Sequence, residues 1–385
     1  MIEIKPKMSE VGQERMLVEL AHLYKNPLHA LREYVTNAVD AHGADRRKGT
    51  FQDGLVNVDI SPQDRRLIIT DNASGMSEAL MRVLPIRIGD SLKAGKPDQR
   101  GEKAVGLLAF GSMGGRCVDI ISRGEGDVGY NHLRYTLEGK EEGNECLRAQ
   151  FERLTSCDVE RNFHGGFDRG TRVLVKTTTE VLKEKLTAPK IRRFLQGTYT
   201  PLLRAGWLPF WVCDISRNEQ EIVDAPTFTG TLLRTERAGG FNAGSKRHPD
   251  ESGLEVYLFF DPSSDSGSVP FFSKDVRVYD RITDLDDDLA ETTLWGCGNV
   301  SGYANDPDLK LTLGRESIDF VRNTRTYRSL IKYLMDLDRE LKPTIESLTN
   351  THRKEKGNKV LEDAWKLLQK AYQETEPINI VRRGG

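Results

Sequence analysis

The chain lacks the features that mark membrane-spanning and secreted proteins. Its 385 residues contain no run of about 18 apolar residues, the length that a membrane-spanning helix needs. The N-terminus has no apolar core of the kind that a secretory signal peptide carries. We therefore expect a cytoplasmic protein that does not enter a membrane.

Cysteine is scarce, and the few cysteines are far apart. The five of them, at positions 117, 146, 157, 213 and 297, form no C-x-x-C pair. A scattered, odd-numbered set indicates reduced thiols rather than zinc ligands or a disulfide framework.

Neither sign of charge dominates. Lysine and arginine number 56, aspartate and glutamate number 58, and the formal net charge at pH 7 is −2. This balance excludes a surface that is basic throughout, so binding of DNA would need a local patch. The candidate patches are residues 46–48, 190–193 and a group of four cations within 353–359. The simpler interpretation of each is a solvated charged face.

A helical motif near the start of the chain carries the strongest functional signal. In the segment LREYVTNAVDA (residues 31–41), Glu33, Asn37 and Asp40 recur at i, i+4 and i+7, which places them on one stripe of a helix. An amide oxygen one turn from a carboxylate suits a hydrated Mg²⁺, and the carboxylate can take a proton from an attacking water. Taken alone, the motif is more typical of an amphipathic helix with a solvated polar face.

A second motif follows a predicted β-hairpin. Residues 56–60 alternate in polarity, residues 61–64 supply a turn, and the apolar strand 67–70 leads into DNASGM, residues 71–76. Asp71, at the mouth of the strand, can accept a hydrogen bond from an exocyclic amine such as that of adenine. Gly75 lets the backbone approach a flat ring, and Met76 offers an adaptable apolar contact.

Two further motifs complete the series. GEKAVGLLAFG, residues 101–111, is a glycine-bearing loop that we expect to open into an apolar helix. Its bare N–H groups around Gly106 and Leu107 and the charge of Lys103 suit phosphates. It does not match a P-loop or a dinucleotide-binding fingerprint. The fourth motif, Gly170 followed by Thr171, enters a strand, and its hydroxyl can reach a base through water.

In this order the four motifs resemble those of the GHKL superfamily of ATPases, which includes gyrase, heat-shock-ninety chaperones, histidine kinases and MutL. The helix resembles the N box, DNASGM the first glycine box, GEKAVGLLAFG the lid and Gly170-Thr171 the last box. The chaperone branch is the closest match, because LYKNP (23–27) and residues 183–212 also resemble chaperone segments. LTLGRES (311–317) resembles the middle-domain loop whose arginine reaches the γ-phosphate.

The resemblance implies a fold and a set of ligands. The fold class is α+β: a Bergerat-type ATP-binding α/β sandwich over residues 1–213, a transducer-like (ribosomal S5-like) α/β domain over 214–349, and a C-terminal helix and tail over 350–385. The ligands are ATP and Mg²⁺. The implied roles are Glu33 as general base, Arg315 as a second catalytic residue, Asn37 as the Mg²⁺ ligand, and Asp71 as the adenine acceptor. The other implied nucleotide contacts are Asp40, Gly75, Met76, Lys93, Lys103, Gly106, Leu107 and Thr171.

The function that the resemblance favours is a chaperone-like, ATP-hydrolysing molecular clamp with a protein client. One alternative is a DNA-acting clamp, as in MutL, MORC or type-VI topoisomerase B proteins, and binding of DNA would support it. Another is a nucleotide-sensing scaffold with slow hydrolysis, because Ala73 and Ala104 stand where the family often has glycine. The chain also allows a homodimer.

The C-terminal half contains further strands and two apolar stripes. Residues 218–252 are turn-rich and polar, whereas 254–260 and 275–279 are strand-like. Two helices with 4-3-4 spacing are expected on either side of Gly357, and each suits either packing on the second domain or a dimer contact. The first stripe is Leu330, Leu334, Leu337 and Leu341, and the second is Leu361, Trp365, Leu368 and Tyr372.

Overall fold

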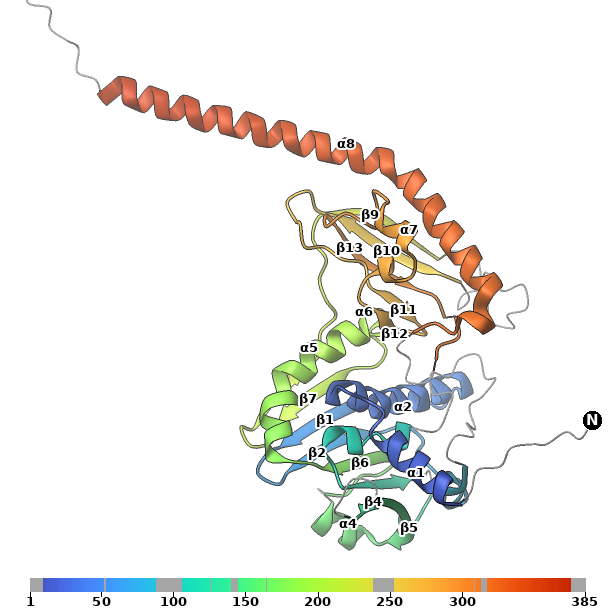
Figure 1. The fold of residues 1–385 in the computed structure, drawn as a ribbon. Helices are drawn as coiled ribbons and strands as arrows, with labels where there is room; N and C mark the ends of the chain where they lie inside the picture. Colours follow the sequence, from blue (N-terminus) through green and yellow to red (C-terminus); the bar gives the residue numbers. More distant parts are fainter. Residues whose placement is uncertain are drawn as a thin grey trace, which may run out of the picture.

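In the computed structural model the chain forms two bodies, each built on its own β-sheet (Figure 1). The helix α8 (Phe320–Glu374) runs along the second body and then projects from it (Figure 1). Within the described residues, no helix is long and apolar enough to cross a membrane. The described residues are 10–51, 53–87, 106–124, 126–139, 145–163, 165–237, 253–307, 309–312 and 317–374.

The first body contains an eight-stranded sheet in the order β5-β4-β3-β6-β2-β1-β7-β8. All its pairings are antiparallel except that of β1 with β7. The predicted hairpin is confirmed as β1 and β2, in which Val56 pairs with Asp71. The strands are β1 (Val56–Ser61), β2 (Arg66–Asp71), β3 (Cys117–Arg123), β4 (Tyr130–Glu138), β5 (Cys146–Leu154), β6 (Gly170–Lys176), β7 (Phe210–Asp214) and β8 (Glu219–Ile222).

The helix that carries the first motif is α2 (Pro27–Lys48), and its ends follow from local chemistry. The side chain of Asn26 accepts a hydrogen bond from the N–H of Leu28, and Pro27 occupies the first turn, where no donor is needed. Gly49 ends the helix with φ of 71°. The apolar side of α2 packs into the main core, together with residues of α1 (Glu10–Ala21), α5 (Ala188–Thr198) and α6 (Thr200–Ala205).

The opposite face of this sheet is also covered by a helix. The short helix α4 (Ser156–Asn162) begins with a capping box at Thr155. It packs Val159 into a second, smaller core against Ile68 and Ile121. The reason is visible in β2 and β3, which contain successive buried apolar residues and are therefore apolar on both faces.

The lid motif does not open into an α-helix as expected. From Gly106 on it forms two short 3-10 turns instead, η2 (Gly106–Leu108) and η3 (Gly111–Met113). Glycines cause the interruption: a Cβ atom at Gly111 would lie 2.7 Å from the backbone oxygen of Ala21, and Gly114 ends η3 with φ of 70°. Two further helices, α3 (Glu78–Val83) and η1 (Leu84–Arg87), lie in the chain between β2 and η2.

The second body has a five-stranded sheet in the order β12-β11-β13-β10-β9. The segment 218–252, expected to be turn-rich, also contains β8 and β9. They were missed because both are edge strands with mostly polar side chains, none of which is buried among those described. The strands are β9 (Thr231–Arg237), β10 (Glu255–Phe260), β11 (Phe271–Ser273), β12 (Val276–Tyr279) and β13 (Val300–Asn305), and two short helices, η5 (Ile282–Asp284) and α7 (Asp287–Ala290), join β12 to β13.

The two C-terminal stripes lie on one continuous helix, α8, so the expectation of two helices is wrong. Gly357 does not end the helix, since one glycine among good helix formers costs only about 1 kcal/mol. The first stripe is buried in the core of the second body. The backbone oxygen of Leu334 accepts a hydrogen bond from the indole of Trp295 at 2.9 Å. Pro343 lies inside α8, and the helix bends along its length (Figure 1).

The two bodies are joined by side chains from β12 and α6. Val276 of β12 is 1% exposed and belongs to the main core of the first body. The guanidinium of Arg204, in α6, lies 4.0 Å from the ring centroid of Tyr257 in β10. The predicted domain limits at residues 213 and 349 stay predictions, although the first sheet extends to Ile222 and α8 runs through residue 349.

Candidate ATP site

Glu33 lies on the buried side of α2, where it is 6% exposed. Its Oε1 lies 3.8 Å from Nε of Arg32, which is also buried. A carboxylate kept from bulk water beside a guanidinium has a fixed position, which a general base requires.

The base of the lid is in contact with this carboxylate. A Cβ atom at position 106 would lie 3.0 Å from Oε2 of Glu33 and 3.1 Å from its Cβ. The hydroxyl of Tyr34 donates to the backbone oxygen of Leu107 at 3.0 Å. The structure therefore brings Glu33, Gly106 and Leu107 together, and α2 holds the start of η2 by a hydrogen bond.

Asp71 is the second buried carboxylate, at the end of β2 and 7% exposed. Its Oδ1 accepts a hydrogen bond from the N–H of Ala73 at 3.0 Å. Burial raises the pKa of Asp71 to about 7; hydrogen bonds from the backbone of Ala73 and Thr171 lower it, and the charge of Asp45 adds to the rise. A buried carboxylate with a raised pKa gains from a ligand that donates hydrogen bonds to it.

Ser122, which the sequence analysis missed, holds two of the predicted contacts, Met76 and Thr171, together with Gly170. Its buried hydroxyl accepts from the N–H of Met76 at 2.7 Å, donates to the backbone oxygen of Gly170 at 3.0 Å, and lies 3.0 Å from the hydroxyl of Thr171. Asn131, also missed, donates to the backbone oxygen of Met76 at 3.0 Å. The available signal was a hydroxyl that follows the buried apolar residues of β3.

Gly75 and Gly170 are required by packing of the backbone. Gly75 has φ of 70°, and a Cβ there would lie 2.2 Å from the backbone oxygen of Arg123. Gly170 has φ of 111°, and a Cβ there would lie 2.0 Å from the backbone oxygen of Asp71. These contacts fix the ends of β2, β3 and β6 around the Asp71 carboxylate.

The donor set on α2 suits Mg²⁺ that keeps most of its ligands as water and phosphate. Asn37 is half-buried one turn after Glu33, whereas Asp40 is 2% exposed. Within the described ranges, no cluster of three or more His, Cys, Asp and Glu residues is arranged to hold a metal by itself. A single amide oxygen fits a metal that arrives with a nucleotide.

Three predicted site residues, Lys93, Lys103 and Arg315, lie outside the described residues, as does Ala104. Ala73 is described and fully buried. Among the described residues other than glycine, positive φ occurs at four positions, and Ala73 is not one of them. The alanine therefore fits this turn without backbone strain.

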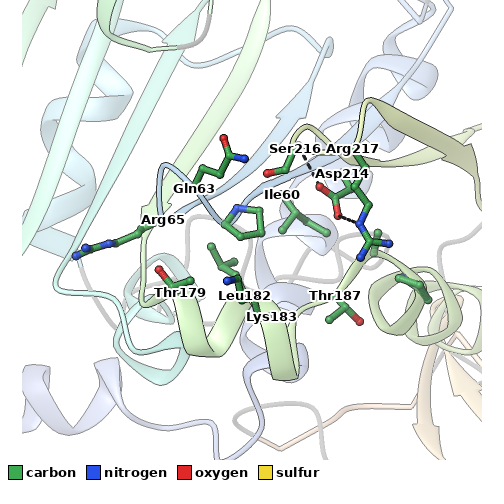
Figure 2. A pocket seen from close by; sticks show the side chains of 13 residues that line it. Ile60, Gln63, Arg65, Thr179, Leu182, Lys183, Thr187, Asp214, Ser216 and Arg217 are labelled. Atoms are coloured by element: carbon green, nitrogen blue, oxygen red, sulfur yellow. Dashed lines mark hydrogen bonds and ion pairs between the residues drawn. The ribbon is translucent and has the colours of Figure 1, made fainter.

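A separate pocket of about 670 Å³ lies at the other end of β2 from Asp71, near the β1–β2 turn (Figure 2). Its wall includes Ile60, Leu182 and Arg65, and Arg217 forms an ion pair with Asp214 at 3.7 Å (Figure 2). None of the predicted site residues lines it, so it is not part of the site around Asp71 and Glu33.

The comparison with protein families supports the first body as a nucleotide-binding domain. Residues 24–165 match the family described as histidine kinase-, DNA gyrase B-, and HSP90-like ATPase. The first body has the GHKL ATPase fold. The matched residues include α2, β2 and η2, and therefore Glu33, Asp71 and Gly106. A GHKL domain supports ATP binding and ATPase activity in general. No curated protein matches the chain.

Proposed function

We propose that the protein is a chaperone-like molecular clamp that binds ATP with Mg²⁺ and hydrolyses it slowly. The observation that carries the proposal is the pairing of two buried carboxylates on one GHKL domain: Asp71 on the sheet and Glu33 against the base of the lid. α2, which carries Glu33, packs against both β2, which ends at Asp71, and η2 at the base of the lid.

In this proposal each carboxylate has one role. Asp71 accepts a hydrogen bond from the adenine amine, with Met76 against the ring and Thr171 contributing through water. Gly106, Leu107 and the two lid lysines, Lys93 and Lys103, hold the phosphates.

Glu33 orients the attacking water and takes its proton as the oxygen of that water bonds to the γ-phosphorus. The bond between the γ-phosphorus and the β–γ bridging oxygen breaks in the same step, and ADP leaves. Asn37 would hold Mg²⁺, which would neutralise charge on the phosphate oxygens, and Asp40 supports this polar stripe.

The proposal that the clamp is chaperone-like rests on sequence resemblance and on the presence of the second body. The segments LYKNP and LTLGRES resemble chaperone segments, and the second places Arg315 in the second domain. An arginine delivered from one domain to the γ-phosphate on another makes closure depend on ATP, because ATP then binds the closed arrangement more tightly.

Substitution Arg315→Ala tests this coupling. We expect ADP affinity to stay unchanged, ATP turnover to fall about tenfold, and compaction on addition of a non-hydrolysable ATP analogue to disappear in small-angle scattering. An arginine that only stabilises the fold would instead lower the melting temperature without nucleotide. A variant that closes and hydrolyses ATP at the wild-type rate would contradict the proposed coupling.

The DNA-acting alternative is distinguished by a separate measurement. Binding of duplex DNA that depends on ATP and weakens steeply with salt would favour it over a protein client. Turnover near zero in the wild type, with ATP affinity intact, would favour the nucleotide-sensing scaffold.

A further inference from the structure

The pocket near the β1–β2 turn lies outside the candidate ATP site, and the proposed function does not use it (Figure 2). Its volume of about 670 Å³ is within the ~300–1,000 Å³ that small-molecule sites occupy. Five segments that are separate in the sequence form its wall. They are the end of β1, the β1–β2 turn, the segment through the π-helical turn η4 (Val181–Lys185), the start of α5 and the β7–β8 turn.

Hydrogen bonds between backbone groups join these segments to one another. The N–H of Thr177, just after β6, donates to the backbone oxygen of Arg65 at 3.0 Å and so joins the β1–β2 turn to the segment that leads into η4. The N–H of Ile215 donates to the backbone oxygen of Ile60 at 3.0 Å and joins the β7–β8 turn to β1. The pocket is therefore pre-formed, and a ligand can bind without the entropy loss of ordering its walls.

The π-helical turn is the least common element in this wall. The N–H of Leu186 donates to the backbone oxygen of Val181 at 2.8 Å, which is the i to i+5 hydrogen bond of a π-helix. Single π-helical turns are rare and occur frequently at functional sites. Two successive residues of this turn, Leu182 and Lys183, line the pocket, the first buried and the second exposed.

The wall carries an excess of positive charge. Among the described residues that line the pocket, Arg65, Lys183 and Arg217 are cationic, and Asp214 is the single carboxylate. Asp214 already forms an ion pair with Arg217 at 3.7 Å. The first turn of α5 also lines the pocket, and the side chain of Thr187 forms no capping hydrogen bond there. The positive end of this helix therefore adds to the charge of the exposed cations.

The interior of the pocket is apolar. Ile60 and Leu182 line it and are each 1% exposed, and the half-buried Pro62 and Ala188 extend this apolar surface. An apolar interior with an exposed cationic rim matches a ligand that has an apolar body and one anionic group. A ligand without charge would leave the rim unused, and an inorganic anion would leave the interior uncovered.

We propose that this pocket is a binding site for a small organic anion. The apolar body of the ligand covers Ile60 and Leu182, and its carboxylate, sulfonate or phosphate group lies at the rim with Lys183. The inference does not depend on the proposed function, because the pocket lies at the other end of β2 from Asp71. The anion and a nucleotide can therefore be bound at the same time.

Calorimetric titration of the full chain with naphthalene-2-sulfonate tests the proposal, since this probe has a flat apolar body and one sulfonate. We expect one site per chain with a dissociation constant on the order of 100 μM, as for a small ligand that makes few contacts. The neutral analogue naphthalene-2-sulfonamide should bind about tenfold more weakly, because it lacks the charge that the rim attracts. Saturation with ADP should leave the affinity for the sulfonate unchanged.

Two lysines of η4 give a matched pair of variants. Both are exposed, but Lys183 lines the pocket and Lys185 does not. Lys183→Ser should weaken binding of the sulfonate about three- to tenfold, whereas Lys185→Ser should bind it as the wild type does. Ser216→Trp, at the exposed wall, should weaken it by about tenfold or more, because the indole takes the space of the naphthalene ring. Equal melting temperatures should show that all three variants are folded.

Four outcomes would overturn the proposal. A wild type that binds no sulfonate up to about 2 mM has no such site. Equal loss of affinity in Lys183→Ser and Lys185→Ser would indicate a general effect of charge. Displacement of the sulfonate by ADP, or normal binding in Ser216→Trp, would place the probe elsewhere. Equal affinity for the sulfonate and the sulfonamide would contradict an anion site.

Discussion

The two ends of the candidate ATP site are built from different kinds of structure. The Asp71 end is made of strand ends, joined by the hydroxyl of Ser122 and by two glycines whose missing side chains allow contact of backbones. The Glu33 end consists of one helix face and a short 3-10 turn. Rigid strands suit recognition of a flat base. A helix face beside a turn that contains glycine suits a catalytic step in which the site changes shape.

The largest expected effect is on ATP turnover, and it distinguishes the Glu33 end of the site from the Asp71 end. Glu33→Ala should lower ATP turnover by about 10²-fold or more while ATP affinity changes only a few-fold, because the general base acts in the transition state. Steady-state turnover and calorimetric titration with ATP measure the two quantities. Unchanged turnover would show that Glu33 is not the base.

Asp71→Asn should do the opposite and weaken nucleotide binding about tenfold or more, since the new amide must turn its oxygen toward the adenine amine. Its effect on stability is a second readout. The folded pKa of about 7 lies above the ordinary 3.8, so the wild type loses stability as pH rises between these values. Without nucleotide, the variant should be more stable than the wild type at pH 8, by about 1–3 kcal/mol, and the difference should vanish near pH 4. Wild-type affinity in the variant would place adenine elsewhere.

Gly106→Ala probes the contact between the Glu33 end and the lid. The added methyl meets the Glu33 side chain at 3.0–3.1 Å, so the carboxylate or the turn must shift by a few tenths of an ångström. We expect turnover to fall several-fold, and by a larger factor than the affinity for ADP. The matched control is Gly357→Ala, where nothing lies within 4 Å and turnover should not change. Equal turnover in both variants would argue against a role for this contact.

The smallest expected effect is a pH dependence confined to the Asp71 end. The ionised carboxylate is the stronger acceptor for the adenine amine, so adenosine affinity should rise a few-fold between pH 6 and pH 8. Asp71→Asn should show a flat profile over the same range. A parallel rise in the variant would assign the titration to another group.

Sequence patterns predicted the parts of this molecule that depend on local periodicity. The β1–β2 hairpin and the stripe on α2 were predicted because polarity repeats at 2 and at 3.6 residues in those segments. The positions of Glu33 and Asp71 followed from the same patterns. Their burial agrees with a site, while their roles stay predictions.

The features that were missed depend on contacts between distant segments. Ser122 looks like any hydroxyl at a strand end, and only the fold places it against Met76 and Gly170, which are about 46 and 48 residues away. The apolar runs of β2 and β3 indicate that both faces of the sheet are covered, but only the fold shows that α4 is the cover on the second face. The continuity of α8 was missed because Gly357 was interpreted as the end of a helix. A lone glycine is only a weak stop signal, and the helix continues through it.

The insertion of Val276 into the core of the first body has a mechanical consequence. A side chain buried in the neighbouring body acts as a pivot, because sliding at this point would open a cavity, whereas rotation about it would not. The second body and α8 then behave as the long arm of a lever. A turn about Val276 moves the far end of α8 further than it moves the second sheet, because displacement grows with distance from the pivot.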